Sequence, residues 1–198
     1  MLFPIIDLPR VEVRPGDRYA TRAGVDIKTL LGSCVAACLY DLEAKVAGLN
    51  HFLLAAPRYS KTMPFTATDA GRYGIHAMEL LINDMVKLGA SRSALRAKVF
   101  GGASVLGIEN EVRFLCVSEV NQRFIRDYLA AEGIPIMSED LGGAVGRVIH
   151  FRTDRFLVYR RFIRRPETVA VEKVELDYWK SAVEVAREGR DEGESILF

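Results

Sequence analysis

The sequence has no stretch that approaches the roughly 20 consecutive apolar residues of a membrane-spanning helix. Residues 1–7 lack the basic region and apolar core of a secretory signal peptide. There is also no excess of charge of one sign, because 27 Lys and Arg residues nearly balance 26 Asp and Glu residues. These absences argue against membrane insertion and against nucleic acid as a partner, and they predict a cytoplasmic protein.

Cysteine is scarce, with Cys34, Cys38 and Cys116 as the three examples. An odd count at irregular spacing argues against a disulfide framework and predicts reduced thiols. A zinc site is a poor alternative, because no CxxC spacing is present. On one strand, Cys34 and Cys38 would lie roughly 13 Å apart, too far to share an ion. The sequence therefore predicts no metal site, and it predicts that Cys38 and Cys116 are core thiols.

The length of 198 residues suits one main domain, which we place at residues 25–165. Residues 1–24 contain scattered Pro and Gly and predict an N-terminal arm with at most a short strand near residues 10–13. Residues 166–198 predict an acidic C-terminal extension, with a possible helix at residues 178–187. Six arginines within residues 151–165 form either a docking surface for an acidic receptor helix or a solvated face paired with that extension.

Two apolar runs, Val35 to Tyr40 and Lys45 to Leu54, flank a short polar segment at residues 41–44. This pattern predicts a hairpin of two buried strands. Cys34 would enter the first strand and His51 would lie on the second, at similar distances from the turn. Antiparallel pairing would then bring the thiol and the imidazole together.

The remaining pattern predicts an α/β fold, with strands at both ends of the chain and two helices between them. We expect a functional flap in the polar loop 55–72 and a helix from Ile75 to Leu88 that ends at Gly89. A second helix, capped by Ser118, would end at Gly133. The expected strands and turns are 97–100, 113–117, 134–137, a glycine-rich turn at 141–147, and a hairpin of 148–152 with 155–162.

A cysteine at a Gly-Ser turn with a histidine 17 positions later is a candidate nucleophile. An ordinary thiol has a pKa near ~8.5, so a neighbouring imidazole would raise its thiolate fraction at neutral pH. We expect the turn to leave Cys34 reachable by substrate at the mouth of its strand. Taken separately, Cys34 would more often be a buried structural thiol and His51 a hydrogen-bonded strand-end histidine.

Five segments of the sequence together resemble the CheD family of chemoreceptor glutamine deamidases, over about residues 25–162. The first is the pentapeptide that carries Cys34, and the second is the Asn-His-Phe-Leu-Leu segment that carries His51. The full set is Leu31-Gly32-Ser33-Cys34-Val35, Asn50-His51-Phe52-Leu53-Leu54, Tyr73-Gly74, Lys98 to Ala103, and Asp140 to Gly143 with Gly146-Arg147.

The resemblance implies a layered α/β sandwich of mixed, largely antiparallel sheets with two main helices, of the cysteine-hydrolase type seen in cytotoxic necrotizing factors. It implies hydrolysis of glutamine side chains on methyl-accepting chemotaxis receptors, with ammonia release and no cofactor. Hydrolysis of receptor methyl esters and pairing with the phosphatase CheC are further implications. A non-catalytic adaptor that binds receptors or CheC is the alternative, and a cysteine hydrolase for another amide is a third.

The family's catalytic cysteine and histidine match Cys34 and His51, and Thr29 is the hydroxyl upstream of the motif that would complete its triad. Backbone N–H groups at Ser33 and Cys34, or at the turn formed by Gly101 and Gly102, could stabilise the oxyanion. Where the family commonly has Ile-Gly-x-Arg-Asn before its second helix, this chain has Val117 to Asn121 and keeps only the asparagine.

Overall fold

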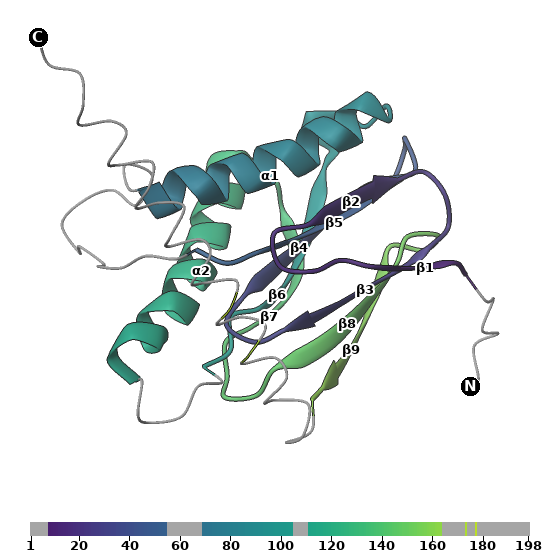
Figure 1. Ribbon diagram of the computed structural model, residues 1–198. Helices are drawn as coiled ribbons and strands as arrows, with labels where there is room; N and C mark the ends of the chain where they lie inside the picture. The colour runs from purple at the N-terminus through teal and green to yellow at the C-terminus, as the bar shows by residue number, and fades with distance from the viewer. Residues whose placement is uncertain (1–7, 55–68, 105–110, 164–172, 174–176, 178–198) are drawn as a thin grey trace, which may run out of the picture.

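The computed structural model describes residues 8–54, 69–104, 111–163, 173 and 177. Its helices and sheets form three stacked layers. Two helices cover one face of a five-stranded sheet, and a four-stranded sheet packs on its other face (Figure 1). The strand orders are β2-β5-β4-β6-β7 and β1-β3-β8-β9. Only the β1–β3 and β6–β7 pairs are parallel among the described strands, so the expected layered, largely antiparallel α/β sandwich is confirmed.

The five-stranded sheet contains the predicted hairpin at its centre. Its strands are β2 (Arg18–Thr21), β5 (Val46–Phe52), β4 (Val35–Asp41), β6 (Arg96–Gly101) and β7 (Ile136–Leu141). Every residue of β4 and β5 is buried, because one face of this hairpin packs on the helices and the other on the second sheet. Burial on both faces explains why these strands are continuous apolar runs and do not alternate with polar residues.

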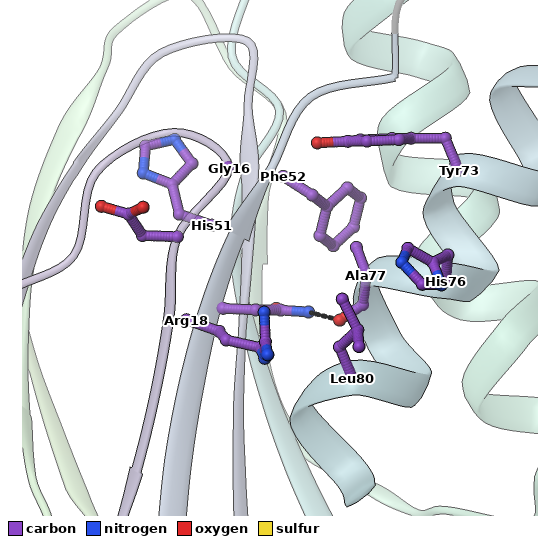
Figure 2. Close-up of a pocket in the computed structure, with 10 residues that line it drawn as sticks. Gly16, Arg18, His51, Phe52, Tyr73, His76, Ala77 and Leu80 are labelled. Carbon is purple, nitrogen blue, oxygen red and sulfur yellow. Dashed lines mark hydrogen bonds between the residues drawn. The ribbon is translucent and has the colours of Figure 1, made fainter. Parts of the chain in front are cut away.

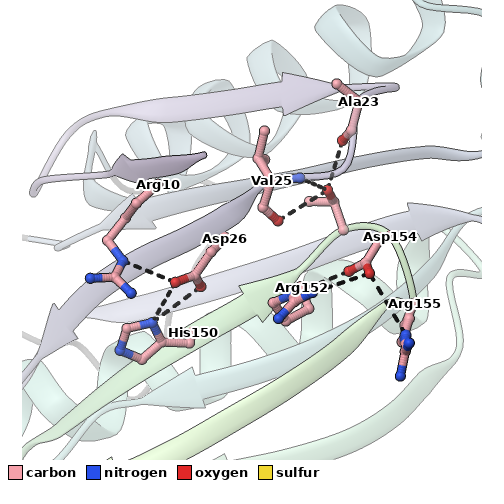
Figure 3. A network of polar contacts seen from close by, with 9 residues as sticks. Arg10, Ala23, Val25, Asp26, His150, Arg152, Asp154 and Arg155 are labelled. Atoms are coloured by element: carbon pink, nitrogen blue, oxygen red, sulfur yellow. Dashed lines mark hydrogen bonds and ion pairs between the residues drawn. The ribbon is translucent and has the colours of Figure 1, made fainter. Parts of the chain in front are cut away.

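The four-stranded sheet consists of β1 (Arg10–Glu12), β3 (Asp26–Leu31), β8 (Arg147–Arg152) and β9 (Leu157–Phe162). A polar network joins the first three of these strands (Figure 3). Arg10 Nε donates to Asp26 at 3.0 Å, and His150 Nδ1 lies 3.0 Å from the same carboxylate. Thr153 accepts from the Val25 N–H at 2.8 Å, which fixes the start of β3 against the turn after β8. The network therefore holds β1 in register on β3.

The two helices of the upper layer are α1 (Asp69–Lys87) and α2 (Glu111–Ala131). Their inner faces repeat at helical spacing. A Cβ added to Gly74 of α1 would lie 2.6 Å from the Phe124 ring of α2, so this glycine lets the two helices approach closely. The buried residues of the two inner faces are Met78, Leu81, Ile82, Met85, Val120, Phe124, Ile125, Tyr128 and Leu129. No helix within the described residues is long and apolar enough to cross a membrane.

The structure corrects three of the predicted elements. Residues 113–117 were expected as a strand but belong to α2, and Ser118 lies inside this helix and does not cap it. A short apolar run has no periodicity that separates a strand from a buried helical turn, which explains this error. The strand expected at 134–137 begins at Ile136 and continues to Leu141.

The N-terminal arm contributes more to the sheets than expected. Besides β1, it supplies β2, which pairs antiparallel with β5 and was not predicted. The division of the chain at residue 24 stays a prediction. Most of the expected flap, at 55–68, and the expected helix at 178–187 lie outside the described residues.

Candidate active site

Cys34 immediately precedes β4, His51 lies on the adjacent strand β5, and both face the same side of the five-stranded sheet. In the β4–β5 ladder, Ala36 is the direct partner of His51. Cys34 lies two residues before Ala36, so it points to the same face and is the diagonal neighbour of His51. This face is turned toward the four-stranded sheet, where Cys34 and Ala36 belong to the core between the sheets.

Thr29, on β3 of the opposite sheet, orients the imidazole. Its Oγ1 lies 2.8 Å from His51 Nδ1, and its hydroxyl donates to the Val13 carbonyl at 2.7 Å. Since a hydroxyl has a single proton, Thr29 must accept a hydrogen bond from the Nδ1–H. That tautomer places the lone pair on Nε2, the nitrogen that a general base would use. The structure thus brings Thr29 to the position expected of a third residue of the site.

A glycine turn holds the backbone of Cys34. Gly102 N–H donates to the Cys34 carbonyl at 2.7 Å, and Ala103 N–H donates to the Gly32 carbonyl at 2.7 Å. Gly101 has φ +114, and a Cβ there would lie 2.1 Å from the Cys34 carbonyl oxygen. No side chain fits between these two backbones, so the close approach requires glycine.

This arrangement changes the expected part of Gly102. Its N–H is engaged by the Cys34 carbonyl, whereas the sequence analysis named the Gly101–Gly102 turn as one of two alternatives for the oxyanion donors. The physical reason is the antiparallel β4–β6 pairing, which brings Val35 opposite Gly101 and continues into the turn. Gly101 and Gly102 therefore position the backbone of Cys34.

Two consecutive residues of α2 reach into the site. The Asn121 amide donates to the Ser33 carbonyl at 3.1 Å and accepts from Leu54 N–H at 2.9 Å. Gln122 Nε2 donates to the Gly102 carbonyl at 2.8 Å. The sequence analysis noted Asn121 only as a retained family residue. A polar amide on the otherwise apolar inner face of a helix is the signal that could have predicted its buried contacts.

The glycine-rich turn after β7 lies next to the site, and the buried Arg147 supports it. This guanidinium donates to the Gly142 carbonyl and to Asp140, at 2.8 Å for the Asp140 carboxylate. Burial lowers the Arg147 pKa, although the negative charge of Asp140 opposes this shift. Ser104 N–H donates to the Gly143 carbonyl at 2.8 Å, so the turn is tied to the segment that follows the Gly101–Gly102 turn.

Comparison with known proteins identifies the family. A family model described as CheD chemotactic sensory transduction matches residues 54–161, more than half of the chain. A Geobacter sulfurreducens protein named "Probable chemoreceptor glutamine deamidase CheD 1" is 54% identical over 175 residues, covering 88% of this chain and 87% of the relative. A Shewanella oneidensis protein named "Probable chemoreceptor glutamine deamidase CheD 2" is 47% identical over 178 residues, covering 88% of each chain. The chain belongs to the CheD family.

Similarity to solved structures is much lower. A Neisseria meningitidis protein, NMB0706, overlaps 70% of this CheD chain and 64% of its own length at 12% identity, with a TM-score of 0.39. This overlap carries no argument about the site. The CheD assignment therefore depends on the relatives and on the family match.

Burial of the thiol in this CheD chain differs from the prediction. Cys34 is 0% exposed and His51 is 1% exposed, whereas the sequence analysis expected Cys34 to be reachable at the mouth of its strand. The expectation was wrong because Cys34 packs in the same buried cluster as Leu53, Phe100 and Val117, which come from three other segments. Cys38 is a core thiol as predicted, and burial raises its pKa.

A small pocket of the CheD fold lies next to His51 but on the α1 side of the sheet (Figure 2). Figure 2 shows the His51 ring turned away from Phe52 and His76, which face this pocket. Neither Cys34 nor Thr29 lines it. The pocket is therefore separate from the thiol side of the site. Its lining residues are Gly16, Asp17, Arg18, Asn50, His51, Phe52, Tyr73, His76, Ala77 and Leu80.

Proposed function

We propose that the protein is a glutamine deamidase that converts selected glutamine side chains of methyl-accepting chemotaxis receptors to glutamate, in the cytoplasm. The observation that carries this proposal is the chain of contacts from Val13 through Thr29 to His51, on the face where Cys34 is the diagonal neighbour. The relatives are named for the same activity. Their names supply the receptor as substrate, and the geometry supports a cysteine nucleophile.

The first half of the reaction forms a thioester and releases ammonia. His51 Nε2 takes the proton from the Cys34 thiol, and the thiolate attacks the side-chain amide carbon of glutamine. The carbonyl oxygen of the amide becomes an oxyanion in the tetrahedral intermediate. His51 then gives its proton to the nitrogen, and the carbon–nitrogen bond breaks. Ammonia leaves, and the acyl group stays bound to the Cys34 sulfur as a thioester.

The second half of the reaction hydrolyses the thioester. His51 Nε2 accepts a proton from water as the water oxygen attacks the acyl carbon. The carbon–sulfur bond breaks, the thiolate recovers the proton, and glutamate is released. Throughout both halves Thr29 keeps Nδ1 protonated and the ring in one orientation.

Backbone N–H groups of Ser33 and Cys34 are the oxyanion donors in this proposal. The Gly102 N–H is already bonded to the Cys34 carbonyl, so it holds the cysteine backbone in place. Each oxyanion donor typically contributes about 3 kcal/mol of transition-state stabilisation. Because Cys34 and His51 are buried, the side chains that cover the sulfur must separate when the substrate glutamine enters.

A non-catalytic adaptor that binds receptors or the phosphatase CheC is the second candidate, and the complete burial of Cys34 is the observation that favours it. The two candidates predict different thiol chemistry. An activated thiol alkylates quickly with a pKa below ~8.5, whereas an adaptor's structural thiol alkylates slowly. The rate of iodoacetamide labelling at Cys34 as a function of pH separates them.

Receptor fragments incubated with the protein, followed by mass spectrometry, test the proposal. The wild type is expected to convert specific glutamines to glutamate and to release ammonia, and Cys34→Ala is expected to do neither while remaining folded. Cys38→Ala is the matched control, since it removes a second buried thiol from the same face of β4. Retained activity in Cys34→Ala would remove the mechanism.

A further inference from the structure

Asn121 is a buried amide that connects the ends of the two strands carrying Cys34 and His51. It is 0% exposed on α2, between the apolar residues Val120 and Phe124 of the inner face. Burying an amide is costly unless both of its polar ends are hydrogen-bonded. Here Nδ2 donates to the Ser33 carbonyl at 3.1 Å and Oδ1 accepts from the Leu54 N–H at 2.9 Å.

The first contact fixes the peptide that leads into the nucleophile. The Ser33 carbonyl and the Cys34 N–H belong to one planar peptide unit, so holding the carbonyl orients the N–H. A hydrogen bond accepted by the carbonyl also polarises the unit and makes its N–H a stronger donor. The Gly102 N–H holds the next carbonyl, that of Cys34, at 2.7 Å. Both peptide planes that flank the Cys34 Cα are therefore fixed.

The second contact fixes the strand that carries His51. Leu54 follows His51 by three residues, just beyond the end of β5. One side-chain amide thereby ties the segment before β4 to the segment after β5, just beyond the last ladder pair, Val35 with Phe52. An apolar side chain at this position would fill the space but could hold neither segment.

We infer that Asn121 is a positioning residue of the deamidase, which orients the Ser33–Cys34 peptide so that the Cys34 N–H stabilises the oxyanion. This inference rests on the proposed function. Asn121 does not touch the substrate in this account. It acts through the Ser33–Cys34 peptide, whose N–H is an oxyanion donor in the proposed function.

Asn121→Asp is the sharpest variant, because it keeps an oxygen for the Leu54 N–H and replaces the donor to Ser33 by an oxygen. An oxyanion contact exists only in the transition state, so its loss lowers kcat without weakening substrate binding. We expect kcat for ammonia release from a receptor fragment to fall about ten- to a hundredfold, with KM changed less than about twofold. Asn121→Ser, whose hydroxyl is too short to connect both strands, is expected to lose kcat as well.

Tyr128→Phe is the matched control. It removes a hydrogen bond of the same helix, from the Tyr128 hydroxyl to Glu79 at 2.5 Å, and has no contact with Ser33. It is expected to keep the wild-type kcat. If a folded Asn121→Asp protein retains a kcat equal to that of Tyr128→Phe, the positioning role is wrong.

The amide resonance of Cys34 in an NMR spectrum tests the same contact without activity. Asn121→Asp and Asn121→Ser should move this resonance, because the Ser33 carbonyl loses its donor, and Tyr128→Phe should leave it in place. A wild type that releases no ammonia would overturn the proposed function, while the Cys34 resonance would still report the contact. An unmoved resonance in both Asn121 variants would overturn the inference by itself.

Discussion

At the scale of single residues, the hydroxyl of Thr29 has one proton and two hydrogen-bond partners, and this determines the tautomer of His51. The proton goes to the Val13 carbonyl, so the oxygen lone pair faces Nδ1 of the imidazole. In the proposed mechanism, a threonine does what a carboxylate does in many other triads, without adding a buried charge. The imidazolium of that mechanism gains a hydrogen-bond acceptor but no ion pair.

Thr29→Val removes this acceptor while keeping the shape of the side chain. We expect kcat to fall about ten- to a hundredfold, because the imidazole can then adopt the wrong tautomer or orientation. Thr29→Ser retains the hydroxyl and is expected to stay within a few-fold of the wild type. Steady-state deamidation of a receptor fragment measures both, and equal activity in Thr29→Val and wild type would show that Thr29 has no part in the reaction.

Gly101→Ala tests the turn that holds Cys34. The new Cβ would lie 2.1 Å from the Cys34 carbonyl oxygen at a φ of +114, so the cysteine backbone must move. We expect a loss of more than about 2 kcal/mol in the free energy of unfolding, together with loss of deamidation. Urea titration and ammonia release measure the two effects.

Gly133→Ala is the control for that variant. Gly133 also has positive φ, +67, but nothing lies within 4 Å of a Cβ added there. It should cost only the backbone strain of about 1 kcal/mol and leave deamidation intact. Equal effects of the two variants would show that crowding against Cys34 is not what makes Gly101 necessary.

At the scale of elements, an ion network joins α1, the 3₁₀ turn η2 (Arg92–Ala94) and the end of α2. Arg92 donates to Glu79 at 2.9 Å and to Glu132 at 2.6 Å, and the Tyr128 hydroxyl also donates to Glu79. The hydrogen bond from Arg92 lowers the Glu79 pKa below its ordinary value of 4.5, although burial opposes this shift. The network clamps the two helices above the sheet that carries the site.

The lowered pKa of Glu79 predicts a pH-dependent contribution to stability. Because the folded-state pKa lies below the unfolded value, the contribution is fully present above about pH 4.5 and is lost as the pH falls through the folded pKa. Glu79→Gln is therefore expected to cost about 1 kcal/mol at pH 7 and less at an acidic pH below 4.5. Urea unfolding at both pH values tests this.

The exposed carboxylate of Glu119 on α2 provides the comparison for Glu79. Glu119→Gln removes the same charge without touching the network, and it should show no loss at either pH. A Glu79→Gln cost that persists unchanged at low pH would mean that shape, and not charge, determines the contribution of Glu79.

At the scale of the whole molecule, the features predicted from the sequence are those that depend on residues close together along the chain. The β4–β5 hairpin follows from two apolar runs around one turn, and the ladder confirms it. The ladder pairs His51 with Ala36, two residues after Cys34, and the working pair of Cys34 and His51 stays a prediction. Both helices were also predicted, although α2 begins earlier than expected. Residues 113–117 were misassigned because their apolar run of four residues, 114–117, has no distinguishing period.

Features that depend on stacking of distant segments could not be predicted in the same way. Cys34 is buried because segments from both sheets and from α2 pack around it. The sequence analysis expected this residue at the mouth of its strand, but it lies in the interior. The contact of Asn121 with Ser33 joins positions 88 residues apart. Strand β2 has only four residues among Pro and Gly, and its pairing with β5 is what makes it a strand.

The central claim is that the sulfur of Cys34 becomes covalently bonded to the substrate acyl group. Acid quenching during turnover of a receptor fragment, followed by peptide mass spectrometry, measures this directly. The account predicts a thioester adduct on the peptide that contains Cys34, and none on the peptide of Cys34→Ala. Conversion of receptor glutamine by the Cys34→Ala protein, with no adduct in the wild type, would contradict it.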